Sequence, residues 1–293
     1  MPNPLRESLF MALQRALPAR LMARLVHAAT RSRTPWFKDL LIRGFVRLYG
    51  VDVSEAAAPV PAGYASFNAF FTRALRPGAR PLAADPAAIL SPADGRIQQI
   101  GPIRDGQILQ VKGLDYTVIE LLGGDAARAA PYRDGSFATL YLAPYNYHRV
   151  HMPLAGEVIR MSYVAGELWS VNATTAARVP RLFARNERLV CHCLAPWGPF
   201  AVILVGALNV GSISTAWAGE VLPRRGGSAH WDYPSGSARI RLDRGEVMGQ
   251  FNMGSTVVVL LPPGVAHWRA ELAAGDPIRV GQALGSLLTP PPA

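Results

Sequence analysis

From about Leu90 to the carboxyl terminus, short apolar and β-branched runs alternate with glycine-containing turns, and this pattern constrains the fold most. Six runs predict strands, at residues 107–111, 137–142, 157–164, 200–208, 238–242 and 256–261. Gly264, Gly275 and Gly281 fall where turns would close the last strands. Half of the 293 residues are hydrophobic, so the chain can bury a large core. We expect a β-rich, sandwich- or barrel-like body.

The first 48 residues have a different character, because their apolar residues follow helical spacing. Leucine recurs at every fourth position, at Leu5, Leu9, Leu13, Leu17, Leu21 and Leu25. Pro18 should kink this helix or start a new one. After Pro35, a second amphipathic helix is expected, with one face formed by Phe37, Leu41, Phe45 and Leu48.

Positive charge is concentrated in the same segment. Residues 1–48 hold nine Arg or Lys and two acidic residues, a net +7 of the chain's formal +10. Basic amphipathic helices of this kind suit the surface of an anionic bilayer. The alternative is that these helices only cap the core.

The two patterns together predict an α+β protein, with amino-terminal amphipathic helices followed by a β-rich catalytic body. Residues 51–65 are rich in Ala and Pro and predict a linker. We therefore place a basic, membrane-associating helical region and linker at residues 1–60 and a catalytic domain at 61–293. A short helix is expected at residues 67–73.

Several function classes are not expected. Cys191 and Cys193 are too few for a disulfide framework and, with His192, lack the further ligands of a metal site, so buried thiols are predicted. There is no glycine-rich phosphate loop, which disfavours a nucleotide cofactor. Arginines interrupt the amino-terminal apolar residues, which disfavours a secretory signal. Residues 201–219 lack charge but are rich in Gly, Ser and β-branched residues, so they predict buried strands and turns and not a membrane span. Interleaved stacking aromatics are missing there, which disfavours nucleic-acid binding.

Three segments carry candidate chemistry: SPADGR at 91–96, YHRVHMP at 147–153 and FNMGST at 251–256. Each alone has a structural explanation, as a turn or a packed polar residue. Together Asp94, His151 and Ser255 supply the acid, base and hydroxyl of a nucleophilic triad.

Ser255 could attack a foreign acyl group, as in a hydrolase, or the carbonyl of its own neighbour Gly254. The absence of a GxSxG motif weakens the first option. A preceding glycine favours the second, because it leaves the carbonyl unshielded and permits unusual backbone angles.

The chain resembles the phosphatidylserine decarboxylase family along nearly its whole length. The matching stretches are FFTR at 70–73 with PGARP at 77–81, SPADG at 91–95, YHRVHMP at 147–153, GELWSVN at 166–172, LFARNER at 182–188 and GST at 254–256. Met253 and Asn146 depart mildly from the family pattern. Asn146 stands where bacterial members often carry Asp, so no role is carried over to it.

The resemblance implies self-cleavage between Gly254 and Ser255. In that scheme Asp94 orients and charge-stabilises His151, and His151 takes the Ser255 proton. The Ser255 oxygen attacks the Gly254 carbonyl, and elimination followed by hydrolysis leaves a pyruvoyl group at residue 255. The products are a β chain, 1–254, and an α chain, 255–293, which is too short to fold alone and should stay associated.

The resemblance also implies a pyruvoyl-dependent decarboxylase. The covalent pyruvoyl cofactor forms a Schiff base with phosphatidylserine and, after loss of carbon dioxide, yields phosphatidylethanolamine. His148 is the candidate proton donor or substrate contact, since a near-neutral pKa suits that task. The implied location is the cytoplasmic face of the inner membrane, peripherally bound, and a homodimer is possible.

Two alternatives remain open at this stage. A non-catalytic, membrane-bound lipid-binding homologue would share the basic helices and stay one chain. A serine hydrolase would use Ser255 without cutting itself. A denaturing gel separates both from a self-cleaving enzyme.

Overall fold

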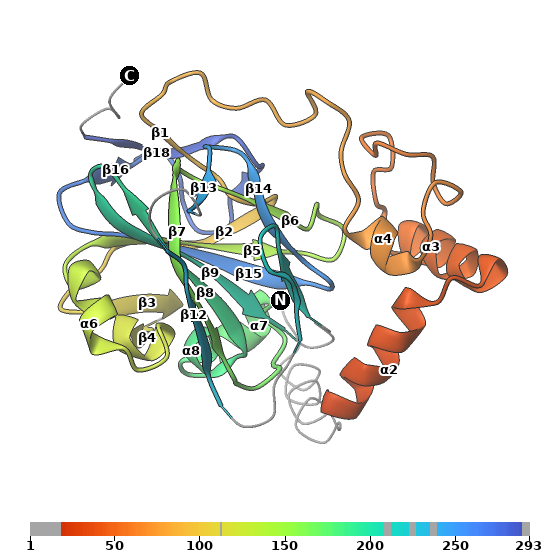
Figure 1. Cartoon of the computed structure of the whole chain (residues 1–293), viewed down its shortest axis with the longest axis horizontal. Helices are drawn as coiled ribbons and strands as arrows, with labels where there is room; N and C mark the ends of the chain where they lie inside the picture. Colours follow the sequence, from red (N-terminus) through yellow and green to blue (C-terminus); the bar gives the residue numbers. More distant parts are fainter. Residues whose placement is uncertain (1–18, 112, 208–211, 223–226, 235–238, 289–293) are drawn as a thin grey trace.

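The computed structural model of the chain describes residues 19–111, 113–207, 212–222, 227–234 and 239–288 (Figure 1). The helices are α2 (Ala19–Arg31), α3 (Pro35–Tyr49), α4 (Phe67–Phe71), α5 (Val118–Leu121), α6 (Ala126–Ala129), the 3-10 helix η1 (Ala130–Tyr132), α7 (Ala173–Ala176) and α8 (Leu182–Arg185). The strands are β1 (Ala88–Leu90), β2 (Gly95–Pro102), β3 (Gln107–Val111), β4 (Leu114–Thr117), β5 (Ser136–Leu142), β6 (Arg149–His151), β7 (Gly156–Val164), β8 (Arg188–Ala195), β9 (Gly198–Gly206), β10 (Ile213–Thr215), β11 (Gly219–Val221), β12 (Ala229–Asp232), β13 (Ile240–Leu242), β14 (Val247–Phe251), β15 (Ser255–Leu261), β16 (Ala266–Trp268), β17 (Pro277–Ile278) and β18 (Ala283–Leu287).

A nine-stranded sheet forms the body. Its strand order is β12-β7-β8-β9-β15-β5-β2-β17, with β13 also paired to β7, and its pairings are antiparallel. β15 lies between β9 and β5, and all seven of its residues are buried. A strand covered on both faces needs no polar alternation, which explains its nearly continuous apolar sequence.

Smaller sheets pack around this one. They have the orders β11-β10-β14-β6, β1-β18-β16 and β3-β4. No sheet among the described residues closes into a barrel, so the body is sandwich-like. The α+β class is confirmed.

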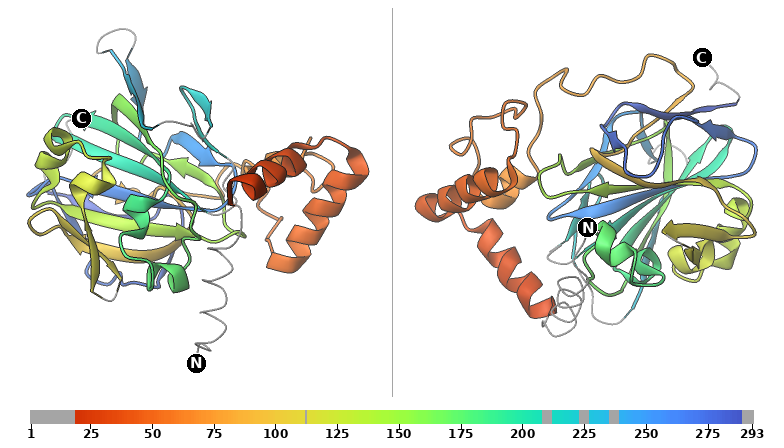
Figure 2. Two further views of the ribbon diagram at one scale, coloured as in Figure 1. Left: turned by 90° about the horizontal axis from the view of Figure 1, so that it is seen from below. Right: turned by 180° about the vertical axis from the view of Figure 1, so that it is seen from behind.

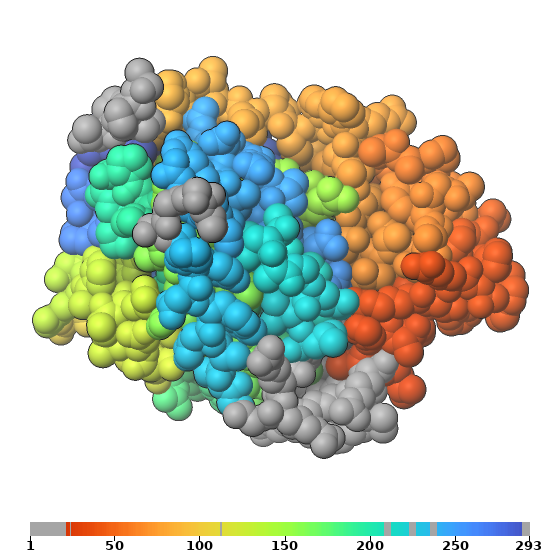
Figure 3. Space-filling view, in the orientation of Figure 1, coloured from red at the N-terminus to blue at the C-terminus, as the bar shows by residue number. Residues whose placement is uncertain are grey.

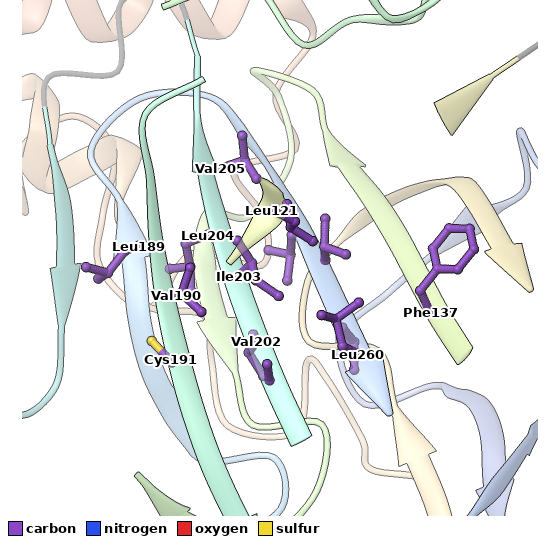
Figure 4. Close-up of a cluster of buried hydrophobic side chains, with 14 of the residues drawn as sticks. Leu121, Phe137, Leu189, Val190, Cys191, Val202, Ile203, Leu204, Val205 and Leu260 are labelled. Atoms are coloured by element: carbon purple, nitrogen blue, oxygen red, sulfur yellow. The ribbon is translucent and has the colours of Figure 1, made fainter. Parts of the chain in front are cut away.

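The main core lies against the large sheet. Figure 4 shows Leu189 and Val190 of β8, Ile203 and Leu204 of β9, and Leu260 of β15, all fully buried. Cys191 and Cys193 are free thiols buried in β8, as predicted. Burial raises the pKa of Cys191 to about 12, so this thiol is unreactive at neutral pH.

The amino-terminal helices project from one side of the body (Figures 1 and 2). α4 connects them to it through a second apolar cluster around Ile42, Phe67, Phe70 and Phe71. Phe45 of α3 contributes an edge-on contact, with its ring centroid 5.1 Å from that of Phe67.

The predicted linker is not free of this cluster. Val51 and Tyr64, near its two ends, are both buried in it. The side chains of Val51 and Tyr64 therefore pack this segment against α3 and α4.

The sequence-predicted strands are confirmed, as β3, β5, β7, β9, β13 and β15, with ends that shift by a few residues. The helix expected at 67–73 is present as α4. Most of the predicted leucine stripe, Leu5 to Leu17, and Pro18 lie outside the described residues. Leu25 of that stripe is on α2 and is 62% exposed.

Packing around β9 gives a first testable prediction. Leu204→Ala should lower the free energy of unfolding by about 2–5 kcal/mol, because it leaves a cavity where Leu204 is 0% exposed. Leu109→Ala on β3 is the matched control; Leu109 is 45% exposed, and its change should be within about 0.5 kcal/mol. Urea unfolding measures both. Equal losses of unfolding free energy in the two variants would contradict the burial of Leu204 and the exposure of Leu109.

Candidate active site

The strand register brings two of the three candidate motifs to one end of the large sheet. Ser255, the first residue of β15, lies opposite Leu142 of β5 and Gly206 of β9. On the far side of β5, Gly95 begins β2, and a Cβ on it would lie 3.5 Å from the Leu142 Cα atom. Neighbouring strands are about 4.8 Å apart. The backbones at Gly95 and Ser255 are therefore roughly two strand spacings apart.

The histidine segment joins these two motifs. The His151 amide, in β6, donates to the Pro92 carbonyl at 2.8 Å, two residues before Asp94. The Phe251 amide donates to the His148 carbonyl at 3.0 Å, four residues before Ser255. The structure thus gathers the three predicted segments, which are up to 160 positions apart in the chain.

Ser255 is buried with an unused hydroxyl. It is 1% exposed, and its Oγ has no hydrogen-bond partner among the described residues. A buried hydroxyl without a partner is costly and rare. Such a group suggests a chemical task.

Gly254 precedes it in open space. A Cβ built on Gly254 would meet no atom within 4 Å, so there is open space on the side-chain position of this residue. The unusual backbone angles that a glycine permits are not used, since Gly254 is absent from the glycines with positive φ.

His151 is held at both ring nitrogens. Nδ1 is 2.7 Å from the Gly245 carbonyl oxygen and Nε2 is 3.0 Å from the Tyr147 hydroxyl. A carbonyl can only accept, so Nδ1 carries the proton and Nε2 accepts from Tyr147. Burial lowers the pKa of His151, so the ring is neutral at pH 7 with its lone pair on Nε2.

A glycine is required at position 245, where the carbonyl accepts from His151. Its φ is +82°, in the left-handed region, and a Cβ on it would lie 2.6 Å from the Leu82 side chain. This turn aims the carbonyl at His151. The sequence offered no signal for it beyond a glycine in a polar turn.

Asp94 does not make the hydrogen bond to His151 that the family resemblance implies. Its carboxylate accepts from Arg80, with Nε at 2.9 Å and Nη2 at 2.5 Å, and from the Val280 amide at 2.9 Å. Arg80 also donates to Glu55 at 2.8 Å. The negative charge of Asp94 nevertheless reaches His151 and opposes the lowering of its pKa by burial.

Arg80 was missed as a site residue, although it lies in the PGARP stretch. Burial lowers its pKa, but the hydrogen bonds to Asp94 and Glu55 more than offset this. Arg80 holds Asp94 through a two-point contact, with Nε and Nη2 donating to the two carboxylate oxygens.

His148 is fully buried and packs on Phe71, with ring centroids 4.0 Å apart. Its Nδ1 donates to the Asn146 carbonyl at 2.9 Å, while Nε2 is buried with no partner among the described residues. Burial lowers the pKa of His148 to about 3. The near-neutral pKa that we expected is therefore not found, because the hydrogen bond to the Asn146 carbonyl offsets only part of the effect of burial.

Asn146 closes the turn that orients His148. Its side-chain oxygen accepts from the Ala143 amide at 2.8 Å, and its carbonyl holds His148. The residue acts here through the shape of the turn, which an Asp side chain could also make.

Asn252 anchors the segment that leads into Gly254. Its amide nitrogen donates to the Ser212 and Ser214 hydroxyls at 2.8 and 3.0 Å, and its oxygen accepts from Asn68 of α4 at 3.2 Å. This buried network links the residues before the Gly254–Ser255 bond to β10 and α4.

Comparison with known proteins agrees with the whole set of motifs. A family model described as phosphatidylserine decarboxylase matches residues 67–286, and a second, described as PSD, matches residues 9–50. Similar relatives are named phosphatidylserine decarboxylase proenzyme. One from Methylococcus capsulatus is 51% identical over 279 residues, covering 95% of this chain and 96% of the relative. One from Pseudomonas fluorescens strain Pf-5 is 50% identical over 283 residues, covering 96% and 98%, and one from Pseudomonas aeruginosa is 51% identical over 280 residues, covering 95% and 97%. The chain belongs to the phosphatidylserine decarboxylase family.

Proposed function

We propose that this chain is a phosphatidylserine decarboxylase that makes its own catalytic group by cleavage at Gly254–Ser255. The observation that carries the proposal is the buried, unpartnered hydroxyl of Ser255 at the start of β15. The strand before it is hydrogen-bonded to the segment that contains His148 and His151. Family membership and the proenzyme names of the relatives support it.

In the proposed processing reaction, the Ser255 Oγ attacks the Gly254 carbonyl carbon and its proton passes to His151. The Gly254–Ser255 amide becomes an ester, and the freed Ser255 nitrogen takes up a proton. Removal of the Ser255 α-proton then expels the Gly254 carboxylate and leaves dehydroalanine. Hydrolysis of that residue releases ammonia and leaves a pyruvoyl group on residue 255.

His151 is prepared for the first step by its tautomer. Gly245 keeps the Nδ1 proton in place, so Nε2 is the basic atom. The Tyr147 hydroxyl occupies Nε2 before the reaction and has to turn away when Ser255 delivers its proton. Asp94, fixed by Arg80, stabilises the imidazolium by its charge and without direct contact.

The position of residue 255 suits a protein-derived carbonyl. The pocket for its side chain is buried, and the strand that follows pairs with β5 and β9 along its length. A pyruvoyl group there supplies a sink for the electrons left when carbon dioxide leaves the substrate. Because β15 is paired on both edges, we infer that the α and β chains stay associated after cleavage.

His148 is suited to moving a proton at its free Nε2. Being neutral, its Nε2 can accept a proton that a stronger acid releases during the reaction. It can later return a proton to the carbon that has lost carbon dioxide. His148 can therefore act as a proton donor in the later step because it has accepted a proton in an earlier one.

We propose that residues 1–60 bind the membrane that contains the substrate. On α3, Leu41 and Phe45 pack toward the apolar cluster, so the expected face is partly used inside the protein. An outward stripe is formed by Trp36 at 70% and Leu40 at 62% exposed, together with Leu48 of the expected face, which is 76% exposed.

Exposed Arg43 and Arg47 accompany that stripe. The helices form a lobe beside the body in Figure 3. An apolar stripe with arginines suits an anionic surface, on the cytoplasmic face of the inner membrane in this proposal. No helix in the described residues is long and apolar enough to cross a bilayer.

Neither alternative gains support from the site. A hydrolase would use Ser255 without cutting its own chain, whereas the relatives are named as proenzymes. A vestigial lipid-binding protein would have no need to keep a buried hydroxyl unpaired.

Ser255→Ala should leave a single band on a denaturing gel, because the attacking oxygen is gone. The unaltered chain should give a large fragment and one of 39 residues, starting at position 255. Ser286→Ala, a half-buried serine on β18, is the control and should be cut normally. Intact mass spectrometry checks the products, and normal cutting of Ser255→Ala would exclude the mechanism.

His151→Ala should block cleavage, while His148→Ala should be cut but release carbon dioxide at least about 100-fold more slowly. His267→Ala, at an exposed position, should change neither rate.

Because burial lowers the pKa of His151 below its usual 6.5, the neutral base persists as pH falls through 6.5. The cleavage rate in cell-free translation should therefore stay level there and fall only at lower pH. If His148→Ala blocks cleavage and His151→Ala does not, the roles assigned to the two histidines are reversed.

The outward stripe should control membrane binding. Replacing Trp36, Leu40 and Leu48 together with Ser should weaken binding to phosphatidylglycerol vesicles by about 10- to 100-fold, through loss of buried apolar area. Leu109→Ser with Ile119→Ser, at positions each 45% exposed on the body, is the control. Co-sedimentation at low and high salt measures this, and salt should weaken the arginine contribution. If the unaltered chain stays in the supernatant at low salt, the membrane proposal fails.

A further inference from the structure

Arg73 is a buried cation with no ion-pair partner among the described residues. It follows α4 and is 4% exposed, and its Nε is buried with no hydrogen bond. Its side chain makes no ion pair with any described residue. The guanidinium instead lies over the Phe70 ring, 5.2 Å from the centroid.

This cation lies beside the candidate active site. The neighbouring Thr72 carbonyl accepts from Arg149 of β6 at 3.0 Å, and Phe71 packs on the His148 ring. The pKa of His148 is lowered mainly by burial, and the charge of Arg73 adds to this. For Tyr147, burial raises the pKa and the charge of Arg73 opposes the rise.

The acids that could neutralise Arg73 are already engaged. Asp94 and Glu55 are near enough to favour its charged form against the dominant effect of burial. Both carboxylates, however, already accept hydrogen bonds from Arg80, at 2.5 Å for Asp94 and 2.8 Å for Glu55. Tyr64, which is also nearby, has a buried hydroxyl with no partner. An unpaired buried charge is strongly unfavourable, so a counterion from outside the chain is the simplest compensation.

We propose that Arg73 binds an oxyanion of the substrate head group next to His148. This rests on the proposed function, since phosphatidylserine carries two such groups, a carboxylate and a phosphate diester. A guanidinium matches the geometry of either. The bound anion completes the charge balance of the site and holds the head group against the catalytic histidine.

The test uses the cleaved enzyme and short-chain lipids, which remove the need for a membrane. Arg73→Gln should raise the KM for dihexanoyl phosphatidylserine by about 10- to 100-fold, with a smaller change in kcat. Arg73→Lys should recover part of the loss. Arg76→Gln, an exposed arginine three residues along, is the matched control and should leave KM unchanged.

A competing ligand identifies the oxyanion. Dihexanoyl phosphatidylethanolamine has the phosphate but no carboxylate. If Arg73 contacts the phosphate, its inhibition constant should rise in Arg73→Gln by a factor similar to that of KM. If Arg73 contacts the carboxylate, the inhibition constant should not change.

Other outcomes overturn the proposal. An unchanged KM in Arg73→Gln, or an equal rise in Arg76→Gln, removes the binding role. Failure of both Arg73 variants to be cut, with a folded circular dichroism spectrum, would assign the residue to processing. Absence of carbon dioxide release from the unaltered chain would instead reject the proposed decarboxylase function itself.

Discussion

The pairing of β15 between β9 and β5 is the constraint on which the other features depend. All seven residues of β15 are buried and paired with β5, the first six are also paired with β9, and the first of them is Ser255. The strand holds that residue rigidly and out of water, while Gly254 before it lies in a more open segment anchored by Asn252. A bond at this junction can be cut while the following residues of β15 stay paired with β5 and β9.

Some polar groups around that strand have hydrogen-bond partners within the protein, and others have none among the described residues. Asp94, Arg80 and His151 have their partners inside the protein, and they shape the site. The Ser255 hydroxyl, the His148 Nε2 and the Arg73 Nε have none among the described residues. Unsatisfied buried groups are usually avoided in folded proteins. In the proposed function, the reaction and a bound ligand would supply the contacts that these three groups lack.

The amino-terminal helices show how one amphipathic segment can serve two surfaces. Phe45 and Ile42 of α3 pack against α4, and α4 in turn places Phe71 against His148. The opposite stripe, with Trp36 and Leu40, has no partner within the described part of the chain and is exposed. The same short helix, α4, therefore lies between the proposed membrane surface and the proposed catalytic histidine. This arrangement would keep the head group of a bilayer lipid close to the site.

The sequence by itself determined the strands, the α+β class and the residues of the candidate site. Alternation of apolar runs and turns is a local property, so strands such as β3 and β15 could be read directly. Asp94, His151 and Ser255 were found because their motifs occur together in one order. Tertiary structure alone decided which groups contact them. The Gly245 carbonyl holds His151 from 94 positions away, and Arg80 takes the carboxylate expected for that histidine. Burial decided the neutral state of His148 and the unpaired state of Arg73, since both depend on which residues surround a side chain in space.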